Sequence, residues 1–158
     1  HLQQTLNEKS IPTFGLDESP QMARQASHRL HRRGIISGLV RGYAQHIPFK
    51  SRIFDSVVAT FPSEYIFDPE TLNEINRLLA QGGRLIILPL AWITGTRPFE
   101  RLAAWLFRTG GQAPGKPGQI SEAIRDRFSQ IGFTVQSEIV ILKGSQVLVI
   151  VAKKGSGA

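Results

Sequence analysis

An acidic residue ends a short apolar run near the beginning of the chain. Residues 11–16 read IPTFGL, Asp17 follows them, and Ser19-Pro20 then supplies a helix N-cap and a first helical residue. A carboxylate at the tip of a buried strand can accept hydrogen bonds from two hydroxyl groups at once. It would also complement the dipole of the following helix, and the two roles are compatible. The pattern predicts a site for a hydroxylated ligand at Asp17.

Two other candidate sites are weaker. The four histidines are scattered without ligand spacing and there is no cysteine, so the sequence requires no metal. His46 is a weak candidate for a general base, the alternative being a solvated loop histidine. Residues 110–116 have the GxxxxGK spacing of a phosphate loop, but Pro117 stands where that loop needs Ser or Thr. The segment also follows a predicted helix and not a strand, so we interpret it as a substrate-side loop.

The elements that would position these residues alternate between helix and strand. Strands are predicted at 11–16, 35–40, 54–60, 84–90, 134–142 and 146–153, and helices at 2–9, 20–33, 69–81, 97–109 and 122–131. Residues 84–90 are apolar almost without alternation, which is typical of a strand buried on both faces of a parallel sheet. The last two strands are close enough in sequence to form a hairpin. The fold class predicted is α/β.

Length and composition describe an ordinary globular protein. The 158 residues indicate one domain, assigned to residues 1–154, with 155–158 as a flexible tail. The longest apolar run, residues 85–93, is far short of the roughly 20 residues of a membrane helix. No signal peptide is visible, and the absence of cysteine fits a reducing compartment. We therefore expect a cytoplasmic protein.

The net charge of +7 is unevenly distributed. No acid occurs between Ser19 and Phe54, a stretch that holds seven Arg or Lys residues. One interpretation is a surface for a nucleic acid, an anionic membrane or an acidic substrate. The other, which we favour at this point, is a solvated helix face, because interleaved aromatic residues and a nucleic-acid motif are both missing. The sequence thus disfavours nucleic acid as a partner.

The order of these motifs resembles one family. A strand–acid–helix unit, then GYAQHIPF, FDSVVATF, GGRLIILPL, IGF and a closing hairpin are similar to a class I S-adenosylmethionine-dependent methyltransferase of the type 11 group. The resemblance implies a Rossmann-like sheet, mostly parallel, with a C-terminal antiparallel hairpin. It implies methyl transfer from S-adenosylmethionine to a small, apolar or aromatic acceptor by in-line displacement, leaving S-adenosylhomocysteine.

The resemblance also assigns cofactor-binding residues. Asp17 matches the acid that binds the ribose hydroxyls, with Glu18 as a weaker neighbour. In the loop after the next strand, Tyr43 stands where the family has an Asp, and Ala44 and Gln45 follow it. The usual carboxylate acceptor for adenine is therefore absent, and the tyrosine could stack or hydrogen-bond instead. The remaining cofactor residues, beside its methionine part, are Thr60 and Phe61.

The acceptor side is implied at Pro62 and Tyr65 and in an insertion at residues 92–118. That insertion combines aromatic residues with arginines; it contains Trp92, Arg97, Phe99, Arg101, Trp105, Phe107 and Arg108. One interpretation is a lid over an apolar acceptor, and an equal alternative is a helix that packs its own aromatics on the sheet. Contact with a membrane surface is a third, less favoured reading.

The family's first strand and its glycine-rich cofactor loop have no counterpart in the sequence. In the family that strand is central, so we expect an interrupted sheet in an N-terminally incomplete chain. Either about 40 further residues precede it, or a homodimer fills the gap by strand exchange. Two rival functions remain open. One is a nicotinamide-dependent oxidoreductase; the other is a non-catalytic, basic methyltransferase-like module that binds RNA or a protein partner.

Overall fold

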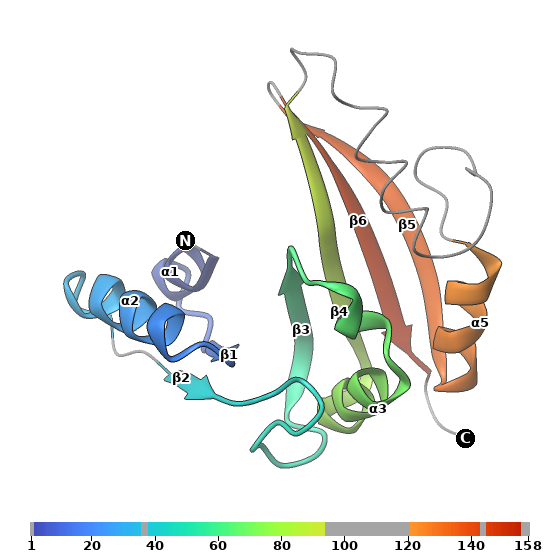
Figure 1. Cartoon of the computed structure of the whole chain (residues 1–158), viewed down its shortest axis with the longest axis horizontal. Coiled ribbons are helices and arrows are strands. Elements are labelled where there is room, and N and C mark those ends of the chain that lie inside the picture. Colours follow the sequence, from blue (N-terminus) through green and yellow to red (C-terminus); the bar gives the residue numbers. More distant parts are fainter. Residues whose placement is uncertain (1, 36–37, 94–120, 143–144, 156–158) are drawn as a thin grey trace. The chain divides into compact units, whose positions relative to one another are not determined.

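The computed structural model describes residues 2–35, 38–93, 121–142 and 145–155 (Figure 1). The chain divides into two compact units, His1–Pro48 and Phe49–Ala158. Each unit is described by itself below. The prediction of one domain over residues 1–154, with an insertion at 92–118, stays a prediction.

The first unit contains two helices and a two-stranded parallel sheet. In chain order the elements are α1 (Leu2–Glu8), β1 (Phe14–Asp17), α2 (Pro20–His31) and β2 (Gly38–Arg41). β1 begins three residues later than predicted but ends at Asp17, where the acid was expected to terminate a strand. α2 begins as predicted, because Ser19 Oγ accepts a hydrogen bond from Met22 N at 3.3 Å and Pro20 needs no amide partner.

The second unit is a four-stranded mixed sheet with helices. Its elements are β3 (Phe54–Thr60), η1 (Glu64–Phe67), α3 (Pro69–Leu78), β4 (Leu79–Ile93), α5 (Glu122–Gln130), β5 (Phe133–Leu142) and β6 (Ser145–Lys154). The strand order is β3-β4-β6-β5, with β3 parallel to β4 and the other neighbours antiparallel (Figure 1). The α/β class and the C-terminal hairpin are confirmed. The short helix η1 was not predicted.

The described strands form two separate sheets, one in each unit, and the predicted interruption of a single sheet stays a prediction. Each unit contains one parallel pair: β1 pairs with β2 in the first unit, and β3 pairs with β4 in the second. Within the described residues, no strand pairs with the second edge of β1 or of β3.

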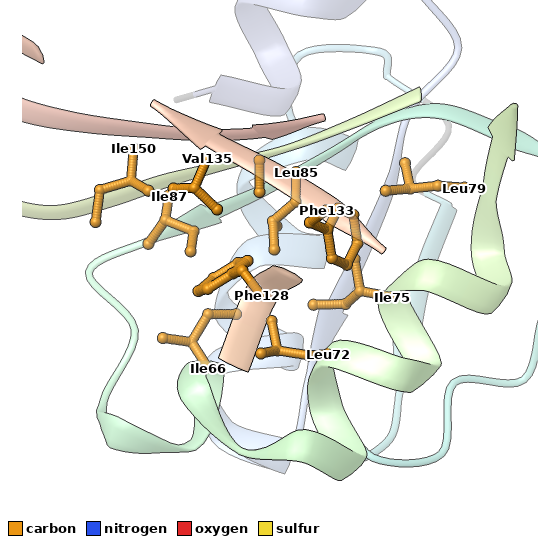
Figure 2. Close-up of a cluster of buried hydrophobic side chains, with 11 residues drawn as sticks. Ile66, Leu72, Ile75, Leu79, Leu85, Ile87, Phe128, Phe133, Val135 and Ile150 are labelled. Carbon is orange, nitrogen blue, oxygen red and sulfur yellow. The ribbon is translucent and has the colours of Figure 1, made fainter. Parts of the chain in front are cut away.

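The core of the second unit lies on one face of its sheet. Leu72 and Ile75 from α3 and Phe128 from α5 meet alternate residues of the strands, such as Leu85 and Ile87 of β4 (Figure 2). All five side chains are at most 2% exposed. Burying one such side chain stabilises the fold by about 1.5–3 kcal/mol. The face of the sheet on which η1, α3 and α5 pack is therefore fixed by the period-two pattern of the strands.

The end of α3 corrects one prediction. Gly82 and Gly83 were expected to terminate this helix, but it ends at Leu78, and both glycines belong to β4. The last carbonyls of the helix are bound by groups remote in sequence. Arg52 N and Ile53 N donate to the carbonyls of residues 77 and 78 at 2.9 and 3.0 Å. Such long-range capping satisfies the helix end without a glycine, which is why the glycine signal misplaced it.

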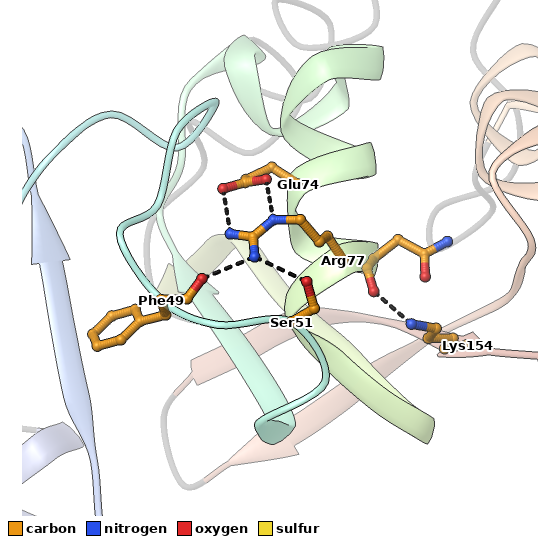
Figure 3. A network of polar contacts seen from close by, with 6 residues as sticks. Phe49, Ser51, Glu74, Arg77 and Lys154 are labelled. Carbon is orange, nitrogen blue, oxygen red and sulfur yellow. Dashed lines mark hydrogen bonds and ion pairs between the residues drawn. The ribbon is translucent and has the colours of Figure 1, made fainter.

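The side chain of Lys154 completes this end of α3 (Figure 3). Lys154 Nζ donates to the carbonyls of Asn76 and Leu79 at 2.6 and 2.8 Å. Burial, and secondly the nearby Arg52, lower the pKa of Lys154. The C-terminal strand is thus tied to the C-terminal end of α3, where a cation complements the helix dipole.

Arg77 anchors the segment that leads into β3. Its guanidinium donates through Nε and Nη2 to both carboxylate oxygens of Glu74, each at 2.8 Å, and through Nη1 to Phe49 O at 2.8 Å and Ser51 Oγ at 3.2 Å (Figure 3). The hydrogen-bonded Glu74 carboxylate raises the pKa of Arg77. The planar, bidentate geometry suits arginine and not lysine.

Candidate functional site

Asp17 is the last residue of β1 and is half-buried. Its Oδ1 accepts a hydrogen bond from Ser19 N at 2.8 Å, and Ser19 also caps α2. The carboxylate is therefore held at the N-terminus of a helix, where the dipole favours negative charge. Its second oxygen, Oδ2, has no hydrogen-bond partner within the described part of the chain. That oxygen is available to an incoming donor.

The register of the parallel pair brings a second loop to Asp17. Asp17 lies opposite Arg41, the last residue of β2, and its carbonyl oxygen accepts a hydrogen bond from Gly42 N at 3.3 Å. Arg41 Nε donates to the carbonyl of Glu18 at 3.4 Å, while the Glu18 side chain is exposed. Since the carboxyl ends of parallel strands share one edge of a sheet, residues 42–46 begin beside the acid.

Residues 42–46 form a tight turn. His46 N donates to Tyr43 O at 3.1 Å, and the two residues form an isolated antiparallel bridge. The Tyr43 side chain is 62% exposed, whereas Ala44 and Gln45 are half-buried and His46 is exposed. A Cβ on Gly42 would lie 3.3 Å from a methyl carbon of the Leu16 side chain. The close approach of the turn to β1 therefore favours glycine at that position.

The second group of predicted residues lies at the carboxyl end of β3, in the other unit. Thr60 is the last residue of that strand, and Phe61 follows with φ +50°, in the left-handed region. Phe61 N donates to Leu88 O at 2.9 Å, which fixes this backbone, and the phenyl ring is 67% exposed. Pro62 is half-buried, and Tyr65, in η1, is 40% exposed. A strained, exposed aromatic residue at a strand end is typical of functional positions.

The structure thus gathers the predicted residues into two groups, one per unit. Asp17, Glu18 and residues 43–46 belong to the first, and Thr60, Phe61, Pro62 and Tyr65 to the second. Trp92 lies in β4, where it pairs with Gln146. Arg97, and with it the rest of the predicted acceptor-side insertion from 94 to 118, lies outside the described residues.

Three residues that the sequence did not single out for this role shape the first group. Ser19 was identified only as a helix cap, but its amide also orients the Asp17 carboxylate. Gly42 and Arg41 join the two loops through backbone and side-chain hydrogen bonds. The signal available for them was strand register, because two parallel strands that end together bring the next residues together.

Other kinds of site receive no support from the described residues. Among them, no group of three or more His, Asp or Glu side chains could hold a metal ion. A cavity of about 550 Å³ is lined by Arg125, Val135, Gln136, Ser137, Glu138, Val149 and Val151, none of which was predicted as a site residue. No helix in the same part of the chain is long and apolar enough to cross a bilayer.

Comparison with known proteins decides the family. A family model described as a methyltransferase domain matches residues 2–87, more than half of the 158 residues. The chain belongs to the class I S-adenosylmethionine-dependent methyltransferase family. Its cofactor is S-adenosylmethionine. The matched stretch contains both groups of candidate residues, from Asp17 through Tyr65.

Individual relatives agree with this assignment. The chain is 32% identical over 73 residues to a demethylmenaquinone methyltransferase of Thermobifida fusca, covering 46% of this chain and 30% of that protein. It is 36% identical over 78 residues to the enzyme of the same name from Lactiplantibacillus plantarum, covering 48% and 33%. The matched stretches therefore span about a third of these relatives' length.

A solved structure supports the fold. Phosphoethanolamine N-methyltransferase 2 of Haemonchus contortus, in complex with phosphomonomethylethanolamine and S-adenosylhomocysteine, superimposes with a TM-score of 0.66 at 15% identity. The superposition covers 98% of this chain and 46% of that one. At 15% identity this similarity supports the fold alone.

Proposed function

We propose that this protein transfers the methyl group of S-adenosylmethionine to a small, apolar or aromatic acceptor, of the kind represented by demethylmenaquinone. The observation that carries the cofactor part is the Asp17 carboxylate, held by Ser19 N at the carboxyl end of β1. Two of the relatives that are at least 30% identical are demethylmenaquinone methyltransferases, and they support the choice of acceptor class.

Within this proposal each cofactor-binding residue has a distinct task. Asp17 accepts hydrogen bonds from the ribose hydroxyls, because Oδ2 has no partner among the described residues and charge-assisted bonds to a carboxylate are the stronger ones. Adenine lies against the turn at 43–46, where the exposed Tyr43 ring supplies a stacking surface and Gln45 a polar side chain. Thr60 and Phe61 take the methionine part, and Glu18 remains a subsidiary contact.

The bound cofactor supplies an electrophilic methyl group on a sulfonium, and the chain's own residues align donor and acceptor. The acceptor side is assigned to Pro62 and Tyr65 and, in the predicted insertion, to Trp92 and Arg97. Exclusion of water by apolar side chains on that side favours attack by the acceptor over hydrolysis. A general base is needed only for a weakly acidic acceptor, and exposed His46 is the candidate in the first unit.

Labelled methyl transfer tests this function. The chain is incubated with S-adenosylmethionine carrying a labelled methyl group and with a reduced, short-chain naphthoquinol, and separately with a polar acceptor such as glycine. We expect label in the naphthoquinol only, and its loss in Asp17→Asn. Label in the polar acceptor alone would overturn the acceptor class while leaving the family intact. Absence of label from both, with S-adenosylhomocysteine bound, would show that the acceptor is of another kind.

A further inference from the structure

One side of α2 packs on the sheet of the first unit, and cationic side chains lie on the rest of its surface. Leu30 is buried, and Ala23 and Ala26 are half-buried toward the β1-β2 sheet. The rest of the helix surface carries Arg24, His28, Arg29 and Arg32, all exposed, and these four residues form the basic face. A helix advances 1.5 Å per residue, so residues 24, 28 and 32 form a line with steps of about 6 Å.

Nothing within the described residues neutralises the basic face. The chain has no acid between Ser19 and Phe54, and none of these arginines takes part in an ion pair in the described part of the structure. Cations near the end of a helix are expected, because they complement the negative end of its dipole. That reason covers Arg29 and Arg32 but not Arg24, which lies in the first half of α2, away from the negative end of the dipole. The basic face is therefore open to an external anion.

The composition of the helix favours a lipid surface over a nucleic acid. Residues 19–42 contain no Phe, Tyr or Trp, so α2 lacks the large aromatic rings on which bases usually stack. It does carry one exposed apolar side chain: Met22, in the first turn, is 54% exposed. Met22 points to another side of the helix than Arg24 and His28, so the basic face itself is cationic, which suits the anionic headgroups of a bilayer.

We propose that the basic face of α2 docks the protein on a bilayer containing anionic phospholipids. The choice of a lipid partner rests on the proposed function, since an apolar acceptor of the menaquinone class partitions into membranes. Ser19, which caps α2, is the residue whose amide holds Asp17. Docking through α2 therefore holds the Asp17 loop at the level of the lipid surface, where a lipid-soluble acceptor is concentrated.

Vesicle co-sedimentation of the full chain tests the surface. The vesicles are phosphatidylcholine with or without phosphatidylglycerol, and the variant is Arg24→Gln/Arg29→Gln/Arg32→Gln. A basic side chain near an anionic leaflet contributes about a fivefold gain in partition. We expect binding only to the anionic vesicles, weakened at least about tenfold in the variant. The matched control, Lys50→Gln/Arg127→Gln/Lys153→Gln, removes the same charge from exposed positions of the second unit and should change binding less than about twofold.

Several results would overturn the proposal. If the control variant loses as much vesicle binding as the α2 variant, binding depends on net charge and not on the basic face. If the wild type binds neutral and anionic vesicles equally, the cations have no role in binding. Tighter binding to a random RNA duplex at equal phosphate concentration would assign the face to nucleic acid. S-adenosylhomocysteine binding, measured in parallel, separates the two proposals: we expect the α2 variant to retain it. Vesicle binding without cofactor binding would contradict the proposed function and leave the surface standing.

Discussion

The carbonyl oxygen of Asp17 accepts a hydrogen bond from the amide of Gly42 at 3.3 Å. This bond joins the loop after β1 to the loop after β2, 25 positions apart in the sequence. Each loop holds residues that the family assignment connects with a different part of the cofactor, ribose for one and adenine for the other. The pairing of two parallel strands therefore sets the spacing between the two contacts.

Asp17→Asn should weaken S-adenosylhomocysteine binding by about ten- to a hundredfold. The amide oxygen can still accept from Ser19 N, so the loop keeps its shape, but charge-assisted bonds to the ribose hydroxyls are lost. Each tenfold corresponds to about 1.4 kcal/mol, which isothermal titration calorimetry resolves. Glu18→Gln is the matched control, because its carboxylate is exposed next to the same loop. Equal effects of the two substitutions would refute the special position of Asp17.

Phe61→Gly should be more stable than Phe61→Ala by about 1 kcal/mol in chemical unfolding. Phe61 has φ +50° and a 67% exposed ring, so removing the ring costs little packing, while the left-handed backbone penalises any Cβ. The neighbouring Thr60 is the control: it is not a positive-φ residue, and Thr60→Gly should be less stable than Thr60→Ala by about 0.5–1 kcal/mol. If the Ala variant is more stable than the Gly variant at both positions, the Phe61 backbone is not strained.

Thr71→Val should raise the melting temperature. Thr71 is fully buried and its Oγ1 has no hydrogen-bond partner in the described part of the chain. Replacing an unpaired buried hydroxyl with a methyl group of similar size should add about 1 kcal/mol to the free energy of unfolding. Thr71→Ser, which keeps the hydroxyl and loses the methyl group, should lower stability instead. Destabilisation by valine would mean that the hydroxyl is satisfied.

Lys154 should make the stability of the protein depend on pH in the alkaline range. Burial, and then Arg52, lower its pKa in the folded state below the ordinary 10.5, so between the two values the unfolded chain binds more protons. The contribution of Lys154 to the free energy of unfolding must therefore rise with pH across that window and be lost below the lowered pKa.

The comparison with Lys154→Met isolates this dependence. The variant leaves the carbonyls of Asn76 and Leu79 without their donor, at a cost of about 1–2 kcal/mol. The difference in free energy of unfolding between wild type and variant should grow as the pH approaches 10.5. A difference that stays constant or shrinks over that range would contradict the direction of the shift.

Some of this structure could be predicted from residue types alone. Asp17 at the end of β1, the cap at Ser19 and the β-branched strand at 54–60 are local patterns, and all three are confirmed. The end of α3 was wrong by several residues because Arg52, Ile53 and Lys154 cap it from distant positions. The orienting roles of Ser19 and Gly42 depend on strand register, which cannot be deduced from the type of a single residue. Local chemistry was therefore predictable, and long-range hydrogen bonds were not.

Calorimetric titration of this chain with S-adenosylhomocysteine tests whether Asp17 is part of a cofactor site. We expect saturable binding of one ligand per chain, with a Kd on the order of micromolar, weakened strongly by Asp17→Asn and much less by Glu18→Gln. That result would mean that the carboxylate held by Ser19 is part of a working cofactor site. No binding, or binding that Asp17→Asn leaves unchanged, would contradict the account.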